Sequence, residues 1–386
     1  MIATIDLPRV GGFALSDRAE LEYWFHLAKQ YPAAIRMDKG EPDLPPPAPV
    51  VATAVRSIQS NQVKYSSGLP QLKRAIAGRL HAKLGVEYEP DTEICITHGA
   101  MGGLNACLEA IDARGGEVAI QDVAWPTFKL LIENAGATVT TYPFFAAAPD
   151  ELSDIDSRRL RAILINSPHN PTGLVISRST LENLLAFARE TNAWIISDET
   201  YEALVFDGHS HVSSVTLPDA REQTLIVGSF SKTYCMTGWR VGYVAGPAHM
   251  IKRVAQVSHL ATGGINRVAQ EAAVAALDTP DANLQKLIDV YKRRGNLAMW
   301  MLEEMPSLRP LRPHGTFYLF VNVERCTRDS RAFARRLLER YDVAAVPGAV
   351  FGIPGEGHVR LSLTVDEKQL REAMRRLIDC AASFLF

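Results

Sequence analysis

The sequence predicts an α/β protein with a mainly parallel β-sheet covered by helices, together with a smaller α+β region. From about residue 93, short runs rich in β-branched residues alternate with longer amphipathic runs, which is typical of strands and helices in a parallel sheet. The strand-like runs are almost continuously apolar, as expected where helices cover both faces. After about residue 277 the pattern changes to a long helical run followed by mixed strands and helices.

Seven short apolar segments are predicted to be strands of the large sheet. They are Glu93–Thr97, Glu117–Gln121, Thr138–Tyr142, Ala162–Asn166, Trp194–Ser197, Leu225–Val227 and Val241–Val244. In the smaller region we expect a helix up to about Met305, a strand over Phe317–Val323, a helix near Arg331–Tyr341, strands ending in Val359–Leu363 and a helix from about Asp366. This pattern predicts two domains, a large one over 45–277 and a small one formed by 1–44 and 278–386.

The composition is that of an ordinary globular protein. Its 386 residues include 41 basic and 43 acidic side chains and are 47% apolar, a length that favours two associated lobes. The chain has no excess of basic residues, which would indicate nucleic-acid binding, and it has no run of about 18 apolar residues, which would predict a membrane span. The amino terminus lacks the features of a secretory signal, and the five scattered cysteines include no CxxC pair. We therefore expect a cytoplasmic protein.

Polar and glycine-rich segments follow four of the predicted strands, where a parallel sheet places its ligand. They are Thr97–Gly103, Ser167–Gly173, Asp198–Tyr201 and Ser229–Lys232. The first lies between a strand and a helix, so its backbone N–H groups can form a phosphate site. It lacks both GxxxxGK[ST] and GxGxxG, which excludes the two common nucleotide-binding motifs.

Three of these segments carry a residue with a chemical use, and each has an ordinary alternative. Lys232, flanked by serines and followed by Arg240, is either an amine nucleophile beside an anion site or a surface lysine. Asp198 can keep a heteroaromatic nitrogen protonated, or it can cap a helix. Asn170 is presented inward by a turn rich in proline and glycine, or it is only part of that turn.

Taken together, these motifs resemble the class I/II aminotransferase family, which belongs to fold type I of the pyridoxal-phosphate enzymes. Asn170, Asp198, Tyr201, Lys232 and Arg240 follow one another in the family's order and close to its spacing, and the resemblance spans nearly the whole chain. It implies pyridoxal 5′-phosphate as the cofactor. It also implies a transferase that moves an α-amino group between an amino acid and a 2-oxo acid in a ping-pong cycle.

The resemblance implies a role for each matching residue. Lys232 would carry the cofactor as a Schiff base and move the substrate proton, for which its amine must be neutral and its pKa lowered. Asp198 would pair with the pyridine nitrogen, while Tyr201 and Asn170 would hydrogen-bond the phenolic oxygen. The phosphate would be held by Ser229, Ser231 and Arg240 together with the amides of Ala100 and Met101, and Gly99 would also bind the cofactor.

Four further positions match family motifs. Trp125 matches an aromatic residue that stacks on the pyridine ring, although a core tryptophan is the alternative. Arg360 matches the arginine that binds the substrate α-carboxylate through a bidentate pair. Gly40 matches a turn beside the substrate. Tyr65 matches a tyrosine that reaches the phosphate of the neighbouring subunit, which implies a homodimer with shared active sites.

Departures from the family pattern bear on the substrate. Met101 stands where relatives that act on acidic amino acids tend to have a basic residue, so we expect that aspartate is not preferred. Lys39 and Glu22–Trp24 are candidate specificity contacts, although such residues more often serve as helix surface or packing. His209 and His211 have a spacing that suits a metal, but their Ser-rich loop offers no nearby carboxylate or cysteine, so we expect a solvated loop and no metal.

Two other functions stay open at this point. The same motifs serve a lyase, cyclase or replacement enzyme, because the bond that breaks depends on the geometry of the pocket. A non-catalytic sensor that binds the cofactor is the second alternative, since aminotransferase-like domains also occur fused to DNA-binding modules. The segment before Gly40 is too short for a winged helix and is not basic, which argues against the sensor.

Overall fold

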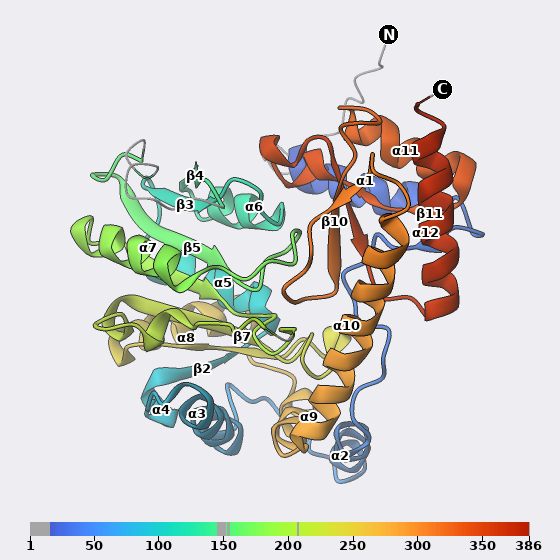
Figure 1. Cartoon of the computed structure of the whole chain (residues 1–386). Helices are drawn as coiled ribbons and strands as arrows, with labels where there is room; N and C mark the ends of the chain where they lie inside the picture. The colour runs from blue at the N-terminus through green and yellow to red at the C-terminus, as the bar shows by residue number, and fades with distance from the viewer. Residues whose placement is uncertain (1–15, 145–151, 153–154, 207, 386) are drawn as a thin grey trace.

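A computed structural model describes residues 16–144, 152, 155–206 and 208–385, so residues 1–15 of the predicted small domain lie outside the described residues. Its central feature is a seven-stranded sheet in the order β2-β8-β7-β6-β5-β3-β4 (Figure 1). The strands are β2 (Ile94–Thr97), β3 (Glu117–Gln121), β4 (Thr138–Tyr142), β5 (Leu160–Asn166), β6 (Trp194–Asp198), β7 (Thr224–Ser229) and β8 (Gly242–Ala245). Only β8 runs antiparallel to its neighbours. All seven predicted strands are confirmed.

Helices cover both faces of this sheet. One face packs against α5 (Gly99–Ala110), α6 (Thr127–Asn134) and α8 (Ala248–Thr262). The other face packs against α2 (Ala48–Gln59), α3 (Pro70–Leu84) and α9 (Arg267–Leu277) near β2, and against α7 (Arg178–Glu190) farther along. On β7, Leu225 and Val227 face the first group and Ile226 faces the second. Burial on both faces explains why the strand sequences are almost continuously apolar.

A second, four-stranded antiparallel sheet is ordered β12-β13-β10-β9. Its strands are β9 (Arg309–Pro310), β10 (Tyr318–Asn322), β12 (Val346–Pro347) and β13 (His358–Ser362). It lies beside α10 (Asp281–Leu302), α11 (Ser330–Tyr341) and α12 (Glu367–Ala382), drawn in orange and red in Figure 1. The predicted strands and helices of this region are present, and the side chain of Asp366 caps α12 by accepting a hydrogen bond from the Gln369 N–H.

The amino-terminal segment packs against this carboxy-terminal part of the chain. β1 (Ile35–Arg36) pairs in parallel with β11 (Val343–Ala344), and α1 (Ser16–Lys29) buries Leu21 and Trp24 in the same core as β10 and α12. Among the described residues, the remaining α-helix is the short α4 (Pro90–Glu93). In the described ranges, no helix combines the length and the apolar character needed to cross a membrane.

The strand directions place four polar segments at one edge of the large sheet. β5, β6 and β7 are mutually parallel, and β2 has the same direction because it is separated from β7 by the antiparallel β8. Their carboxyl ends, Thr97, Asn166, Asp198 and Ser229, therefore meet along one side.

A buried polar cluster lies behind the end of β6. Glu199 is 4% exposed and accepts hydrogen bonds from the hydroxyls of Ser213 (2.6 Å) and Ser197 (2.9 Å). Nε2 of His211 lies 3.2 Å from a Glu199 carboxylate oxygen, and the His211 side chain is 4% exposed. Burial alone would raise the pKa of Glu199, but His211 and the serine hydroxyls hold it below its ordinary value of 4.5.

The expected solvated loop is therefore wrong for His211, although His209 is exposed. The carboxylate partner of His211 is Glu199, which directly follows β6. The sequence around His211 itself therefore gives no sign of this partner. The sequence also marks Asp198, and not its neighbour Glu199, as the carboxylate of interest.

We expect His211→Gln to lower the free energy of unfolding by about 3 kcal/mol, because the carboxylate of Glu199 then stays buried without its His211 partner. Urea unfolding at neutral pH measures this, with His209→Gln as the exposed control, which should change it by less than about 0.5 kcal/mol. Equal losses in both variants would contradict the importance of the buried pair.

The difference in free energy of unfolding between wild type and His211→Gln should also depend on pH. A glutamate with a depressed pKa stabilises the fold above its ordinary value of 4.5 and loses this contribution as the pH falls through the lower folded value. The gap between wild type and His211→Gln should therefore shrink below pH 4.5.

Candidate active site

A cavity of about 680 Å³ lies where the ends of β5, β6 and β7 meet α1 and the second sheet. It contains nearly every site residue that the sequence predicts. These are Gly40, Ala100, Met101, Trp125, Asn170, Asp198, Tyr201, Ser229, Ser231, Lys232, Arg240 and Arg360. Gly99 adjoins the cavity behind Arg240, and Tyr65 lies elsewhere on the surface.

Lys232 projects into this cavity from the segment after β7. Its amine donates a hydrogen bond to the backbone carbonyl of Gly40 and lies 5.6 Å from the ring centre of Phe317. Burial, together with the positive charges of Arg240 and Arg360, lowers the pKa of Lys232 to about 8 even though Glu41 and Asp198 favour the charged form. A neutral amine is therefore accessible near neutral pH, which is the state that a nucleophile or base requires.

Asp198 ends β6 and is 5% exposed. Its Oδ1 accepts hydrogen bonds from the hydroxyl (2.6 Å) and the N–H (3.1 Å) of Thr200. Burial raises the pKa of Asp198 to about 6, against the effect of these hydrogen bonds, and the negative charge of Glu199 adds to the rise. The carboxylate stays mainly ionised at neutral pH, and a cationic ring nitrogen placed beside it would be stabilised.

Asn170 and Tyr201 lie on the same wall of the cavity and are held by groups that the sequence did not single out. The Asn170 N–H donates to Oδ1 of Asn166 at 3.0 Å, which places the side chain at the end of β5. The hydroxyls of Tyr201 and Tyr318 are 3.0 Å apart. Tyr318 belongs to β10, so a residue of the second sheet completes this wall.

The start of α5 and Arg240 together form an anion site. Arg240 has a left-handed backbone with φ +55, and its guanidinium lies so close to Gly99 that a Cβ there would come within 2.8 Å of it. Gly99 is also left-handed, with φ +64, so any other residue would be strained as well as crowded. The first-turn N–H groups of α5, the guanidinium and the hydroxyls of Ser229 and Ser231 suit a phosphate.

Arg360 lies on β13 and is 2% exposed. Its guanidinium donates to Oδ1 of Asn170 (3.0 Å) and to the carbonyl of Asp38 (2.7 Å), and it packs on the Tyr318 ring. In the described part of the chain, its Nε has no hydrogen-bond partner and no carboxylate forms an ion pair with it. A buried arginine with only neutral partners is a strong site for a carboxylate ligand.

The residues present fit pyridoxal phosphate. Asp198 and the anion site formed by α5 and Arg240 supply complementary charges for its ring nitrogen and its phosphate, and Lys232 supplies an amine in the same cavity. Trp125, which packs edge-on against Phe128 at 5.4 Å, lines the cavity and is therefore more than a core residue. A side chain at position 40 would force the Tyr318 hydroxyl to move, because a Cβ there would lie 2.4 Å from it.

Several lining residues were not predicted as part of the site. They include Leu21, Phe25, Glu41, Thr127, Phe128, Asn166, Thr200, Thr237, Gly238 and Tyr318. Glu22 lines the cavity too, in agreement with its selection as a candidate specificity contact, whereas Lys39 does not. The signal for Asn166 and Thr200 was present, since both adjoin predicted strand ends. Nothing local distinguishes Phe25 or Tyr318 from core residues, because their position depends on how the second sheet meets the first.

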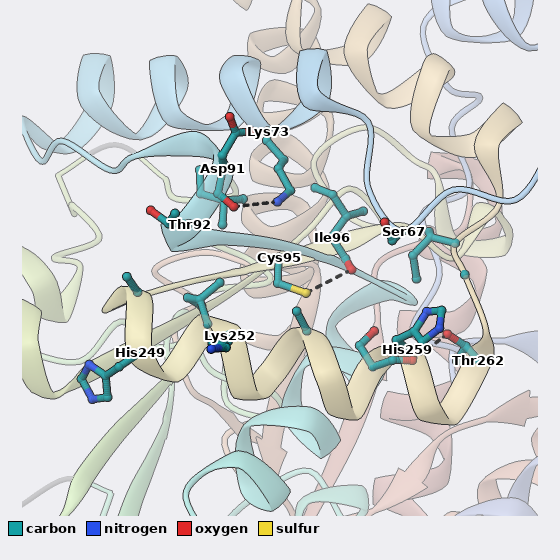
Figure 2. Close-up of a pocket in the computed structure, with 17 residues that line it drawn as sticks. Ser67, Lys73, Asp91, Thr92, Cys95, Ile96, His249, Lys252, His259 and Thr262 are labelled. Atoms are coloured by element: carbon teal, nitrogen blue, oxygen red, sulfur yellow. Dashed lines mark hydrogen bonds between the residues drawn. The ribbon is translucent and has the colours of Figure 1, made fainter.

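A second cavity of about 510 Å³ lies between the edge strand β2 and α8 (Figure 2). Lys73 and His259 line it, and the Lys73 amine donates to the Asp91 carbonyl at 3.1 Å. None of the predicted catalytic residues is there. Among the residues that the structure describes, no group of three or more His, Cys, Asp or Glu side chains could hold a metal ion.

Comparisons with known proteins agree with this geometry. The arginine–pyruvate transaminase of Pseudomonas aeruginosa is 35% identical over 353 residues, which is 90% of this chain and 89% of that protein. A structure titled Pyrococcus protein-A1 superposes with a TM-score of 0.91 at 33% identity, covering 96% of this chain and 99% of that one. Aspartate aminotransferase from Thermus thermophilus, solved with maleate, gives a TM-score of 0.87 at 32% identity, covering 95% and 96%.

These similarities show a pyridoxal-phosphate-dependent aminotransferase of fold type I, as the sequence motifs predict. The family profile for aminotransferase class I and II matches residues 33–377, which spans both sheets and every residue that lines the cavity except Leu21, Glu22 and Phe25 of α1. The chain therefore belongs to the class I and II aminotransferase family.

Proposed function

We propose that this enzyme moves the α-amino group of an amino acid other than aspartate to a 2-oxo acid in a ping-pong cycle, with Lys232 as the catalytic amine. The observation that carries the proposal is that Lys232 lines the same cavity as the buried Arg360, for which the described residues provide no carboxylate partner. A transaminase needs an amine that reacts and a site for the α-carboxylate that both of its substrates have.

When bound, pyridoxal phosphate supplies a carbonyl that takes up an amino group and a ring that withdraws electrons from it. Asp198 would keep the ring nitrogen positive, while Tyr201 and Asn170 would hydrogen-bond its phenolic oxygen. Gly99, Ala100, Met101, Ser229, Ser231 and Arg240 would hold the phosphate, and Trp125 would lie against the ring.

Lys232 would carry the cofactor between turnovers and then move the proton of the substrate α-carbon. With a pKa of about 8, a useful share of its amine is neutral at pH 7 and most of it is neutral at pH 9. Arg360 would bind the α-carboxylate and so fix the position of the α-carbon relative to this amine, with Gly40 beside it.

We also propose the division into a large domain over 45–277 and a small one formed by 1–44 and 278–386, with the cavity between them. The pairing of β1 with β11 and the separate four-stranded sheet support this division. A cytoplasmic location is proposed from the free cysteines, of which Cys95, Cys107 and Cys380 are buried.

The most direct test of transamination uses an amino donor alone. Without a 2-oxo acid, the purified enzyme should convert in a single turnover from the pyridoxal to the pyridoxamine form, as followed by absorbance. Addition of a 2-oxo acid should reverse the change. A cofactor that returns to its starting spectrum while the donor is degraded would instead indicate a lyase.

Aspartate should be a poor donor, because the cations that line the cavity already have other ligands. Arg240 is used by the phosphate, Arg360 by the α-carboxylate and Lys232 by the cofactor, while Met101 has no charge. We expect half-reaction rates with aspartate to be at least about tenfold below those with neutral, aromatic or basic amino acids, since a distal carboxylate would be desolvated without a partner. A clear preference for aspartate would overturn this part of the proposal.

A homodimer with shared active sites is proposed from an exposed apolar region around Tyr65. Tyr65 is 95% exposed and Leu260 is 86% exposed. The two segments lie side by side, because the Ile265 N–H donates to the Ser66 carbonyl at 2.7 Å. Large apolar side chains exposed to this extent in neighbouring segments fit contact with a second copy.

Sedimentation or light scattering should therefore give twice the chain mass for the wild type and a smaller mass for Leu260→Glu, because the new charge would be buried in the interface. Ile353→Glu is the matched control, since Ile353 is 92% exposed but belongs to the carboxy-terminal part of the chain. A monomeric wild type would exclude the shared site.

A further inference from the structure

We propose that Arg294 and Asp43, which do not line the cavity, form a positioning pair for the proposed reaction: they set the place of the free Lys232 amine relative to the carboxylate site of Arg360. The inference rests on the proposed function, in which Lys232 moves the proton of the substrate α-carbon. It adds to that function two residues that act through others and do not touch the substrate themselves.

Arg294 holds Asp43 in one orientation. It lies on α10, drawn in orange in Figure 1, and is 5% exposed. Its two terminal nitrogens donate to the two carboxylate oxygens of Asp43, each at 2.8 Å, and the Tyr291 hydroxyl donates to the same carboxylate at 3.2 Å. An arginine that binds a carboxylate through two parallel hydrogen bonds fixes its orientation as well as its distance.

A short segment connects Asp43 to the catalytic amine. Gly40 precedes Asp43 by three residues, and its backbone carbonyl accepts the hydrogen bond of the Lys232 amine. Pro42 lies between them, and its ring fixes its own φ and restricts the residue before it. Three extended residues span at most about 10 Å. Because the segment is this short and stiff, a shift of Asp43 would also move the Gly40 carbonyl.

The other end of this segment is fixed to the second sheet. The Ser362 N–H donates to the Met37 carbonyl at 2.6 Å, and Arg360 donates to the Asp38 carbonyl at 2.7 Å. Residues 37–43, which we call the strap, are therefore held at both ends. Between these ends, carbonyls of the strap accept hydrogen bonds from the substrate arginine and from the catalytic amine.

Arg294 also contacts the strand that carries the substrate arginine. Its guanidinium donates to the Leu363 carbonyl at 2.9 Å, and Leu363 directly follows β13, on which Arg360 lies. One buried side chain thus fixes the strap beside the Lys232 amine and the end of the strand that would bind the α-carboxylate. A misplacement of about 1 Å can lower the rate of a catalytic step about a hundredfold, so this distance matters for proton transfer.

The alternative is a pair that only stabilises the fold, and three variants distinguish the two roles. Asp43→Asn keeps the size of the side chain but removes one accepting oxygen, and Arg294→Lys keeps the charge but loses the two-pronged contact. Arg293→Lys is the matched control. It makes the same change one residue earlier on α10, where the side chain is 61% exposed and pairs with Glu367.

The first measurement is made on the amine itself. In the pyridoxamine form of the holoenzyme the Lys232 amine is free, so its pKa can be measured. Each protein is loaded with pyridoxamine phosphate and acetylated briefly with acetic anhydride at a series of pH values. Mass spectrometry of the digested protein then gives the pH midpoint at which Lys232 is labelled.

We expect this midpoint to be at least about half a pH unit lower in Asp43→Asn and Arg294→Lys than in the wild type. Burial lowers the pKa of the amine most, and the charge of Glu41, which lies on the strap, opposes it. A displaced strap would remove both this charge and the Gly40 carbonyl, two groups that favour the charged amine. The other charges that act on the amine, those of Asp198, Arg240 and Arg360, do not lie on the strap.

The second measurement is the rate of proton transfer. Alanine, phenylalanine and arginine, each with hydrogen or deuterium on the α-carbon, are mixed singly with the pyridoxal form of the enzyme. For every donor that the wild type converts, the maximal single-turnover rate should fall about tenfold or more in both pair variants. The deuterium isotope effect should rise, because proton transfer then limits the rate. Arg293→Lys should match the wild type in both measurements.

The outcomes separate the inference from the proposed function. Unchanged midpoints in both Asp43→Asn and Arg294→Lys, or an equal shift in Arg293→Lys, would overturn the inference and leave transamination intact. A wild type that no donor converts to the pyridoxamine form would instead overturn the proposed function. If Arg294→Lys does not fold, Asp43→Asn decides alone, because its side chain is 26% exposed and Arg294 keeps the Leu363 carbonyl as a partner.

Discussion

The functional arrangement of this enzyme depends on one constraint: a lysine amine must be able to lose its proton near neutral pH in a cavity that also has to bind anions. Lys232 meets this constraint because burial and the positive charges of Arg240 and Arg360 outweigh the acids nearby, which lowers its pKa to about 8. The same two arginines would bind the phosphate and the α-carboxylate. The groups that hold the ligands therefore also keep the amine reactive, and ligand binding would change the charge that Lys232 experiences.

The fold satisfies this constraint by bringing together residues that are far apart in the sequence. Parallel strands place Asn166, Asp198 and Ser229 along one edge, and the start of α5 adds the N–H groups that an anion needs. The second sheet supplies Arg360 and Tyr318. Arg360 donates to Asn170, so a hydrogen bond links the second sheet to the segment after β5 through the proposed substrate site. Its other bond, to the Asp38 carbonyl, ties the second sheet to the amino-terminal segment.

Much of this was accessible from the sequence, for physical reasons that can be stated. The strands were predictable because burial on both faces makes them continuously apolar, and residues at their carboxyl ends have to meet in a parallel sheet. Lys232, Asp198 and Arg240 could be assigned because their order and spacing resemble those of the class I/II aminotransferase family, and that resemblance implies their roles. Tyr318 and the partner of His211 could not be found in this way. The position of Tyr318 depends on how one sheet packs on the other. The pairing of His211 depends on the side of the strand end on which a carboxylate lies. Local sequence patterns contain neither kind of information.

The central claim is that Lys232 is the amine that carries the cofactor. Reduction of the purified holoenzyme with borohydride fixes the cofactor permanently to the amine that holds it, and mass spectrometry of the digested protein then identifies that residue. We expect the pyridoxyl group on Lys232 alone, and none on the nearby Lys39 or on Lys73 of the second cavity. A label on any other lysine, or a protein that binds no pyridoxal phosphate, would contradict the assignment of Lys232 and the catalytic roles proposed around it.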